Sequence, residues 1–165
     1  MSDGAGMKRL RLVTHSPQET RQLAARLARH LAPGDVVALH GELGSGKTEF
    51  VHGLAQGLEV PSREAVASPS FTLIHEYLGR LPLIHLDLYR LETLPPEMLP
   101  DLEEYLAGAG VVAVEWAERL GALLPPDHLE VRLAMAGDSD REFTFCAHGP
   151  RSEHLVRQLA AEVAG

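Results

Sequence analysis

The sequence predicts an α/β domain in which helices pack on a sheet of mixed parallel and antiparallel strands. Segments with strand and helix patterns alternate along the chain, which is typical of this fold class. Two short runs, 36–39 and 111–114, are wholly apolar, as expected for strands buried on both faces. Two pairs of strand candidates flank tight turns, which indicates antiparallel pairing as well. For 165 residues we expect one domain over 1–165, with 1–7 as a flexible leader.

The first elements have clear boundaries in the sequence. A strand is expected over 9–13. Ser16 then caps a helix, Pro17 takes its first position, and Glu19 completes a capping box. This helix has one apolar face, formed by Leu23, Leu27 and Leu31. A Pro-Gly pair at 33–34 ends the helix before the apolar strand at 36–39.

The rest of the chain continues the alternation of strands and helices. The expected elements are a helix over 47–58, strands over 70–77 and 83–88 around a turn at 79–80, a helix over 96–106, a strand over 111–114, strands over 129–133 and 141–146 around a turn at 137–138, and a helix over 152–163. Together they predict one core around a mixed sheet.

Composition and charge exclude several classes of protein. Apolar residues make up 45% of the chain and charged residues 23%, which suits a globular protein and excludes disorder as the main state. No apolar run approaches the ~20 residues of a membrane span, and no secretion signal is recognisable, so we expect no membrane association. The net charge of −8 disfavours strong direct binding of nucleic acid. The single cysteine, Cys146, excludes an internal disulfide and fits the cytoplasm.

A glycine-rich segment directly after the strand at 36–39 matches a phosphate-binding loop. It fits G-x-x-x-x-G-K-[ST] at every fixed position and consists of Gly41, Glu42, Leu43, Gly44, Ser45, Gly46, Lys47 and Thr48. Glycines let successive backbone N–H groups turn toward phosphate oxygens, and the following helix directs its positive end there. Lys47 reaches the β- and γ-phosphates, and the Thr48 hydroxyl binds Mg²⁺. The alternative is an ordinary turn with a surface lysine, which the flanking strand and helix disfavour.

Such a loop also needs an acidic side chain for Mg²⁺ at the end of an apolar strand, and the sequence has two. Asp87 ends one strand candidate, and Glu115 ends the more uniformly apolar one. Two carboxylates near one Mg²⁺ can divide the work, one on the metal and one on the attacking water. Alternatively, either acid caps its strand or pairs with an arginine such as Arg90 or Arg119.

The sequence predicts which base is bound less strongly than it predicts phosphate binding. The chain contains no asparagine and so lacks the N-K-x-D loop by which GTPases recognise guanine, which favours adenine by elimination. Trp116 either stacks near the nucleotide or fills the core, and both interpretations stay open. The nine histidines lack the spacing and the cysteine partners of a zinc site, so we expect no metal cluster.

Four sequence blocks together resemble a known family. They are the loop at 41–48, the segment Ser68, Pro69, Ser70, Phe71, Thr72 and Leu73, the run H-L-D-L-Y-R at 85–90, and V-E-W at 114–116. In this order and spacing they resemble the TsaE family, formerly YjeE, the ATPase of bacterial tRNA threonylcarbamoyladenosine biosynthesis. The resemblance extends over about 16–145, and the four blocks are far more specific than the phosphate loop alone.

The resemblance implies a fold and a function. The implied fold is a three-layer α/β/α domain of the P-loop NTPase type, with a mixed sheet of about seven strands. The implied activity is a Mg²⁺-dependent hydrolysis of ATP to ADP and phosphate, which we expect to be slow in the isolated chain because the sequence shows no internal arginine finger. It supports the partner proteins TsaD and TsaB, which transfer threonylcarbamoyl to N6 of adenosine at position 37 of tRNA. The chain would not form that bond itself and would meet tRNA only through the complex.

The resemblance also implies roles for residues at matching positions. Thr48 and Glu115 match the Mg²⁺ ligands, Asp87 the acid needed for hydrolysis, and Trp116 a tryptophan whose surroundings respond to nucleotide. The switch-like loop that responds to the γ-phosphate is matched by Ser68, Pro69, Ser70, Phe71 and Thr72. The adenine is expected between 16–18 and the hairpin at 137–141. The nucleotide-binding residues are then Gly41, Gly44, Ser45, Gly46, Lys47, Thr48, Glu49, Trp116 and Gln18, with Lys47 and Asp87 catalytic.

Three positions of the loop region depart from the usual residues of that family. Glu42 stands where Asp is more usual and Ser45 where Ala is, but both positions mainly offer their backbone to phosphate. Glu49 replaces a hydroxyl residue after Thr48. A carboxylate there would weaken binding of an α-phosphate if it faced the nucleotide, and would be harmless if it turned outward.

Two other function classes remain to be weighed against the ATPase. A small-molecule kinase with a P-loop generally carries an arginine-bearing lid, and the sequence contains no arginine-rich segment of that kind. A nucleotide-bound interaction module without hydrolysis would not need acids at the positions of Asp87 and Glu115. The kinase is the runner-up interpretation.

Overall fold

The fold is described from a computed structural model, in which the described residues are 8–42, 45–61, 65–67, 74–88 and 91–164. In chain order the strands are β1 (Arg9–Thr14), β2 (Val36–Gly41), β3 (Ala65–Ala67), β4 (Ile74–Tyr77), β5 (Leu83–Asp87), β6 (Val111–Glu115), β7 (Leu129–Met135) and β8 (Arg141–Ala147). The α-helices are α1 (Pro17–Ala28), α2 (Lys47–Gly57), α3 (Leu99–Ala107) and α4 (Pro150–Ala164), and the 3₁₀ helices are η2 (Pro96–Met98) and η3 (Ala117–Leu123). None of these helices combines the length and apolar character needed to cross a bilayer.

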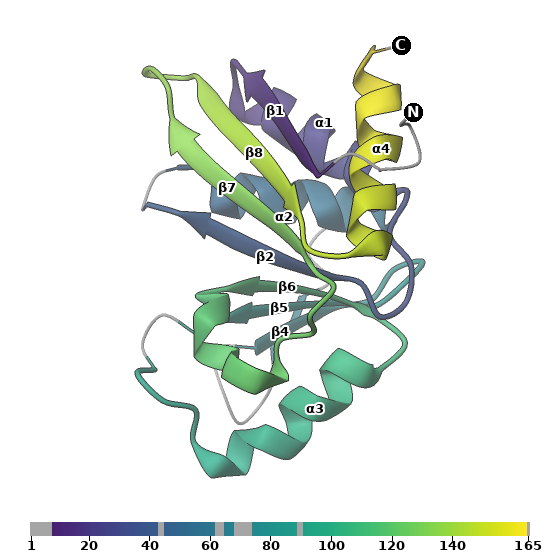
Figure 1. The fold of residues 1–165 in the computed structure, drawn as a ribbon, viewed down its shortest axis with the longest axis vertical. Helices are drawn as coiled ribbons and strands as arrows, with labels where there is room; N and C mark the ends of the chain where they lie inside the picture. The colour runs from purple at the N-terminus through teal and green to yellow at the C-terminus, as the bar shows by residue number, and fades with distance from the viewer. Residues whose placement is uncertain (1–7, 43–44, 62–64, 68–73, 89–90, 165) are drawn as a thin grey trace.

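The strands form one mixed sheet in the order β1-β8-β7-β2-β6-β5-β4-β3 (Figure 1). At its centre β2 runs parallel to both β6 and β7, and β5 runs parallel to β6. The pairs β4–β5 and β7–β8 are antiparallel, as their turns predicted. The predicted α/β class with a mixed sheet is therefore confirmed. Within the described residues the sheet has eight strands, against about seven expected, and the short β3 was not predicted.

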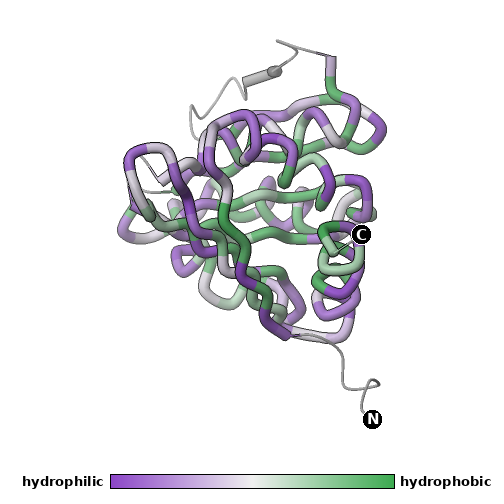
Figure 2. Tube along the Cα trace, turned by 90° about the horizontal axis from the view of Figure 1, so that it is seen from above, coloured by the Kyte–Doolittle hydropathy of each residue, from purple (hydrophilic) through white to green (hydrophobic). Residues whose placement is uncertain are grey.

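Helices cover the sheet from both sides, which gives three layers. On one side α1, α2 and α4 enclose the larger core, whose aromatic members are Phe50, Phe143 and Phe145. On the other side α3 and η3 enclose a smaller core that includes Met98 and Leu102. Hydrophobic residues gather in the central strands between these layers, whereas the outer turns are hydrophilic (Figure 2). The apolar runs 36–39 of β2 and 111–114 of β6 contribute alternate residues to each core, as strands buried on both faces must.

The start of α1 forms as its sequence predicts, with one difference. The Ser16 hydroxyl accepts a hydrogen bond from the backbone N–H of Glu19 at 3.1 Å. The Glu19 carboxylate accepts from the backbone N–H of His15 at 2.7 Å, one residue before the position that a capping box uses. Leu23 and Leu27 of its apolar face are buried as expected, whereas Leu31 is buried but lies beyond the end of α1 at Ala28.

Two segments differ from the elements expected for them. The predicted helix over 96–106 is divided into η2 and α3, with Pro100 in the first turn of α3, where a missing N–H removes no helical bond. The 3₁₀ helix η3 after β6 was not predicted, and it is kinked at Gly121, which has a φ of 54°. Of the strand expected over 70–77, residues 70–73 lie outside the described residues, and the remainder is β4.

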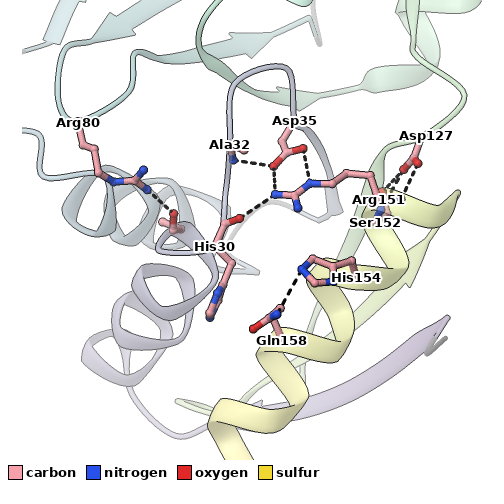
Figure 3. A network of polar contacts seen from close by, with 10 residues as sticks. His30, Ala32, Asp35, Arg80, Asp127, Arg151, Ser152, His154 and Gln158 are labelled. Atoms are coloured by element: carbon pink, nitrogen blue, oxygen red, sulfur yellow. Dashed lines mark hydrogen bonds and ion pairs between the residues drawn. The ribbon is translucent and has the colours of Figure 1, made fainter. Parts of the chain in front are cut away.

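A polar network ties the start of α4 to the opposite end of the sheet from the phosphate loop (Figure 3). Arg151 donates to both carboxylate oxygens of the buried Asp35, at 3.0 and 2.9 Å, and also to the carbonyl of His30. Asp127 accepts from the backbone N–H groups of Arg151 and Ser152 and from the Ser152 hydroxyl, at 2.8, 3.0 and 2.6 Å. Asp127 thus caps α4 from a distant part of the chain.

This cap predicts a pH-dependent contribution to stability. Partial burial alone would raise the pKa of Asp127, but the hydrogen bonds from Ser152 and from the two backbone N–H groups outweigh it and hold the pKa below its usual 3.8. Because the folded-state pKa is lowered, the stabilisation is complete above 3.8 and is lost as the pH falls through the lower folded value. We expect Asp127→Ala to lower the free energy of unfolding by about 1 kcal/mol at pH 7.

Urea denaturation of wild type and Asp127→Ala at pH 7 and at pH 2.5 measures this contribution. The difference between the two proteins should shrink at the lower pH. Asp138→Ala, on the exposed β7–β8 turn, is the matched control. An effect of Asp127→Ala that is the same at both pH values would contradict a charged cap.

Candidate functional site

The two ends of the segment between β2 and α2 are placed as a phosphate-binding loop requires. Gly41 ends β2, and α2 begins at Lys47, so the loop leads from a central strand into the positive end of a helix. Gly46 adopts a φ of 108°, in the left-handed region that favours glycine. Leu43 and Gly44 lie outside the described residues.

A close contact at Gly41 explains why this position is a glycine. A Cβ placed there would lie 2.5 Å from the Ser45 Oγ and 2.8 Å from the backbone oxygen of Leu133. Ser45 itself is only 1% exposed, and its Oγ has no hydrogen-bond partner among the described residues. Buried hydroxyls normally have a partner, so the loop carries a polar group that a bound ligand can satisfy. Gly41 and Ser45 also line a cavity of about 470 Å³.

Lys47 meets the second predicted element of the site, Glu115 at the end of β6. Its Nζ lies 3.3 Å from Glu115 Oε1. The other carboxylate oxygen, Oε2, lies 2.7 Å from Nε2 of His85 on the neighbouring strand β5. Glu115 is 8% exposed. Burial alone would raise its pKa, but the hydrogen bond from His85 and the charges of His85 and Lys47 hold the pKa below its usual value.

The two predicted acids lie side by side. Asp87 and Glu115 are register partners at the carboxyl ends of the parallel strands β5 and β6. Side chains of residues paired in this way point to the same face of the sheet. Leu39 of β2 is the register partner of Glu115 on its other side, which brings both acids close to the loop that follows β2. The Glu115 carboxylate also contacts Lys47 at the start of α2, which places it beside the predicted phosphate loop.

Trp116 is not a core residue. It is 38% exposed and has a φ of 64°, a strained backbone conformation for a bulky residue, of the kind that occurs at functional sites. The guanidinium of Arg119 lies 5.2 Å from the centroid of its ring. With Gly41 and Lys47, Trp116 lines a small cavity of about 150 Å³. Of the two interpretations left open by the sequence, burial in the core is wrong.

The two segments expected to flank the adenine are neighbours in the structure. Their strands pair antiparallel, with Thr14 opposite Arg141. His15 Nδ1 lies 3.0 Å from Asp140 Oδ1, which joins the turn before α1 to the β7–β8 hairpin. Gln18 is exposed in the first turn of α1. A Cβ at Gly46 would lie 3.8 Å from the Arg141 side chain, so the hairpin also borders the phosphate loop.

Three predictions near the phosphate loop remain: Thr48, Glu49 and the switch-like loop. Thr48 is exposed in the first turn of α2. The Glu49 carboxylate turns toward α1, where its Oε1 lies 2.6 Å from the Arg21 guanidinium, so only the Glu49 backbone remains to meet a phosphate. The predicted switch-like loop lies outside the described residues, and it consists of Ser68, Pro69, Ser70, Phe71 and Thr72.

Sequence reasoning missed two residues at this site. His85 precedes Asp87 by two positions on β5, a spacing that places both side chains on one face of a strand and that could have revealed it. Arg141 was expected only as the edge of a hairpin. Its guanidinium donates to the carbonyls of Gly137, Asp138 and Asp140, at 3.4, 3.3 and 2.9 Å.

The site suits a metal ion that is held partly by protein side chains and partly by a phosphate ligand. Among the described residues, no three His, Cys, Asp or Glu side chains converge as a metal cage. Mg²⁺ is usually held by one or two carboxylates together with phosphate oxygens of a substrate. The Glu115 carboxylate near the end of β2, with Thr48 at the start of α2, provides ligands of this type.

Comparison with known proteins gives consistent matches over most of the chain. The family model described as "Threonylcarbamoyl adenosine biosynthesis protein TsaE" matches residues 14–143. The tRNA threonylcarbamoyladenosine biosynthesis protein TsaE of Bacillus subtilis is 44% identical over 155 residues, covering 93% of this chain and 96% of that protein. The protein of the same name from Treponema pallidum is 41% identical over 135 residues, covering 82% and 98%. The crystal structure of Bacillus subtilis YdiB superposes with a TM-score of 0.78 at 40% identity, covering 94% of this chain and 97% of that one.

Proposed function

This chain belongs to the TsaE family, and from that premise we propose that it binds ATP with Mg²⁺ and hydrolyses the ATP slowly. The hydrolysis supports the TsaB–TsaD complex in forming N6-threonylcarbamoyladenosine at position 37 of tRNA in the cytoplasm. The observation that carries the proposal is the contact between Lys47 and Glu115, 3.3 Å apart, where the phosphate loop meets the end of β6. A cation from the loop and an acid from the neighbouring strand are the two groups that a P-loop NTPase requires.

The residues of the site divide the work as follows. The backbone N–H groups of the loop and the Lys47 ammonium bind the phosphates. Thr48 and Glu115 would hold Mg²⁺, which when bound offsets the negative charge of the β- and γ-phosphates. Asp87, beside Glu115, orients the attacking water and accepts its proton. The exposed Trp116 and the segments around Gln18 and Arg141 would border the nucleoside.

The proposed slow hydrolysis by the isolated chain follows from how its arginines are engaged. Arg119 stacks on Trp116 and donates to the carbonyl of Leu91. Arg141 donates to three carbonyls of its own hairpin. Both guanidinium groups thus already have partners, which they would have to leave in order to contact a γ-phosphate. Because an arginine that contacts the γ-phosphate accelerates hydrolysis strongly in related enzymes, partner proteins would complete the site.

The charge of the chain supports an indirect relation to tRNA. With 15 basic and 23 acidic residues, its net charge of −8 opposes binding to the phosphate backbone. The partner proteins would then provide most of the affinity for tRNA.

A multiple-turnover modification assay tests the proposal. Purified TsaB and TsaD, tRNA and excess threonylcarbamoyl-adenylate are incubated with ATP, with and without this protein. We expect repeated turnover only when the protein and ATP are both present. Equal turnover with and without the protein would refute the proposed role. If ADP forms only when one particular metabolite is added, the small-molecule kinase is the better reading.

A further inference from the structure

His85 contacts Glu115, but the proposed function assigns it no task. It lies on β5 two residues before Asp87, on the face of the sheet that carries both acids. Its register partner on β6 is Ala113, whose small side chain leaves the imidazole room to reach diagonally to Glu115. His85 Nε2 lies 2.7 Å from Glu115 Oε2, and the two side chains are 16% and 11% exposed.

The two oxygens of the Glu115 carboxylate have different partners. Oε2 contacts Nε2 of His85, while Oε1 lies 3.3 Å from the Lys47 Nζ. A carboxylate only accepts hydrogen bonds, so Nε2 of His85 is the donor. If Lys47 turns to the phosphates of a bound nucleotide, as proposed above, Oε1 becomes available to a cation while His85 still holds Oε2.

We propose that His85 is a positioning residue, which fixes the Glu115 carboxylate through Oε2 so that Oε1 is directed at Mg²⁺ beside the phosphate loop. Hydrogen bonds to the far oxygen of a metal-binding carboxylate orient it, and their loss typically weakens metal binding 10- to 100-fold. The inference rests on the proposed function, because it concerns the same Mg²⁺ site. It assigns His85 no contact with nucleotide, so ATP binding without metal should not depend on it.

A pair of amide substitutions separates this role from a structural one. In His85→Gln the amide nitrogen of the side chain extends about as far as Nε2, whereas in His85→Asn it reaches only as far as Nδ1. Both variants replace the ring by a small neutral amide. They differ in whether a donor can reach Glu115 Oε2.

The measurement is ATP affinity by isothermal titration calorimetry, in EDTA and over a series of free Mg²⁺ concentrations. For His85→Asn we expect the Mg²⁺ midpoint to rise 10- to 100-fold while the affinity in EDTA stays at the wild-type value. For His85→Gln we expect a midpoint within about threefold of wild type. His52→Asn makes the same replacement on α2, where the side chain is 56% exposed, and is the control.

Each other outcome contradicts the inference in a distinguishable way. A wild-type Mg²⁺ midpoint in His85→Asn would show that Glu115 needs no such support. An equal loss of ATP affinity with and without Mg²⁺ would make His85 a structural residue of the strand. Failure of the wild-type protein to bind ATP at all would overturn the proposed function, and this role of His85 with it.

Discussion

The Lys47→Ala variant is expected to bind ATP at least a hundredfold more weakly than wild type and to support no repeated turnover of TsaB and TsaD. Lys47 follows Gly46 at the start of α2 and points to the end of β6, where its Nζ lies 3.3 Å from Glu115. At this place the ammonium can form charge-assisted hydrogen bonds to two phosphate groups, each contributing about 1.5–3 kcal/mol. Two such contacts correspond to a loss of about two to four orders of magnitude in affinity.

The chain contains one other lysine, which provides a matched control. Lys8 precedes β1 and is exposed. We expect Lys8→Ala to bind ATP as wild type does, so a general effect of lost positive charge is separated from the loss at the loop. Calorimetric titration with ATP, followed by the turnover assay, measures both properties on the same preparations.

The two readouts also distinguish an ATPase from a module in which nucleotide is incidental. If Lys47→Ala loses ATP binding but still supports turnover, the partner function does not require nucleotide. If it retains ATP binding, Lys47 acts only as the ion-pair partner of Glu115 within the fold, and the proposed phosphate site is wrong.

Local sequence patterns predicted most of the fold because each pattern has a local physical cause. Ser16 caps α1 through a bond from the backbone N–H of Glu19, only three residues away, and the apolar runs of β2 and β6 are typical of central strands. The unpredicted elements lack such signals. The strand β3 is only three residues of Ala and Val, and η3 bends at Gly121 inside a segment without clear periodicity.

The site was predictable where its residues are adjacent in the sequence and less so where they meet across strands. Gly41 to Thr48 form one continuous motif, and Asp87 and Glu115 each end a recognisable strand. The contact of His85 with Glu115 depends on the register of β5 against β6, which the sequence alone does not determine. The position of Arg141 beside Gly46 likewise depends on how the β7–β8 hairpin meets the loop.

Replacement of Glu115 by Gln should have opposite effects on ATP binding with and without Mg²⁺. Glu115 Oε1 lies 3.3 Å from the Lys47 Nζ, and this contact competes with those that the ammonium would make to a phosphate. Glutamine keeps the shape of the side chain but removes the charge that holds Lys47 and repels phosphate. In EDTA, Glu115→Gln is therefore expected to bind ATP about three- to tenfold more tightly than wild type, corresponding to about 1 kcal/mol for a partly shielded ion pair.

In Mg²⁺ the same variant should lose function. A neutral amide is a much weaker ligand for Mg²⁺ than a carboxylate, and the affinity that wild type gains from the metal should be absent. We expect ATP hydrolysis and turnover with TsaB and TsaD to fall at least a hundredfold, since the site would no longer hold the metal that offsets the phosphate charge. Glu103→Gln, on the exposed surface of α3, is the control for loss of a negative charge.

The opposite signs make this prediction a strict test of the assignment of Glu115. An acid that only stabilises the end of β6 would, on replacement, weaken ATP binding equally in EDTA and in Mg²⁺, because the loop beside it would lose its support. An acid that only holds Lys47 would give tighter binding under both conditions. Only a residue that binds Lys47 in the ligand-free protein and Mg²⁺ in the complex changes the sign of its effect between the two, which is the behaviour that its contacts with Lys47 and His85 lead us to expect.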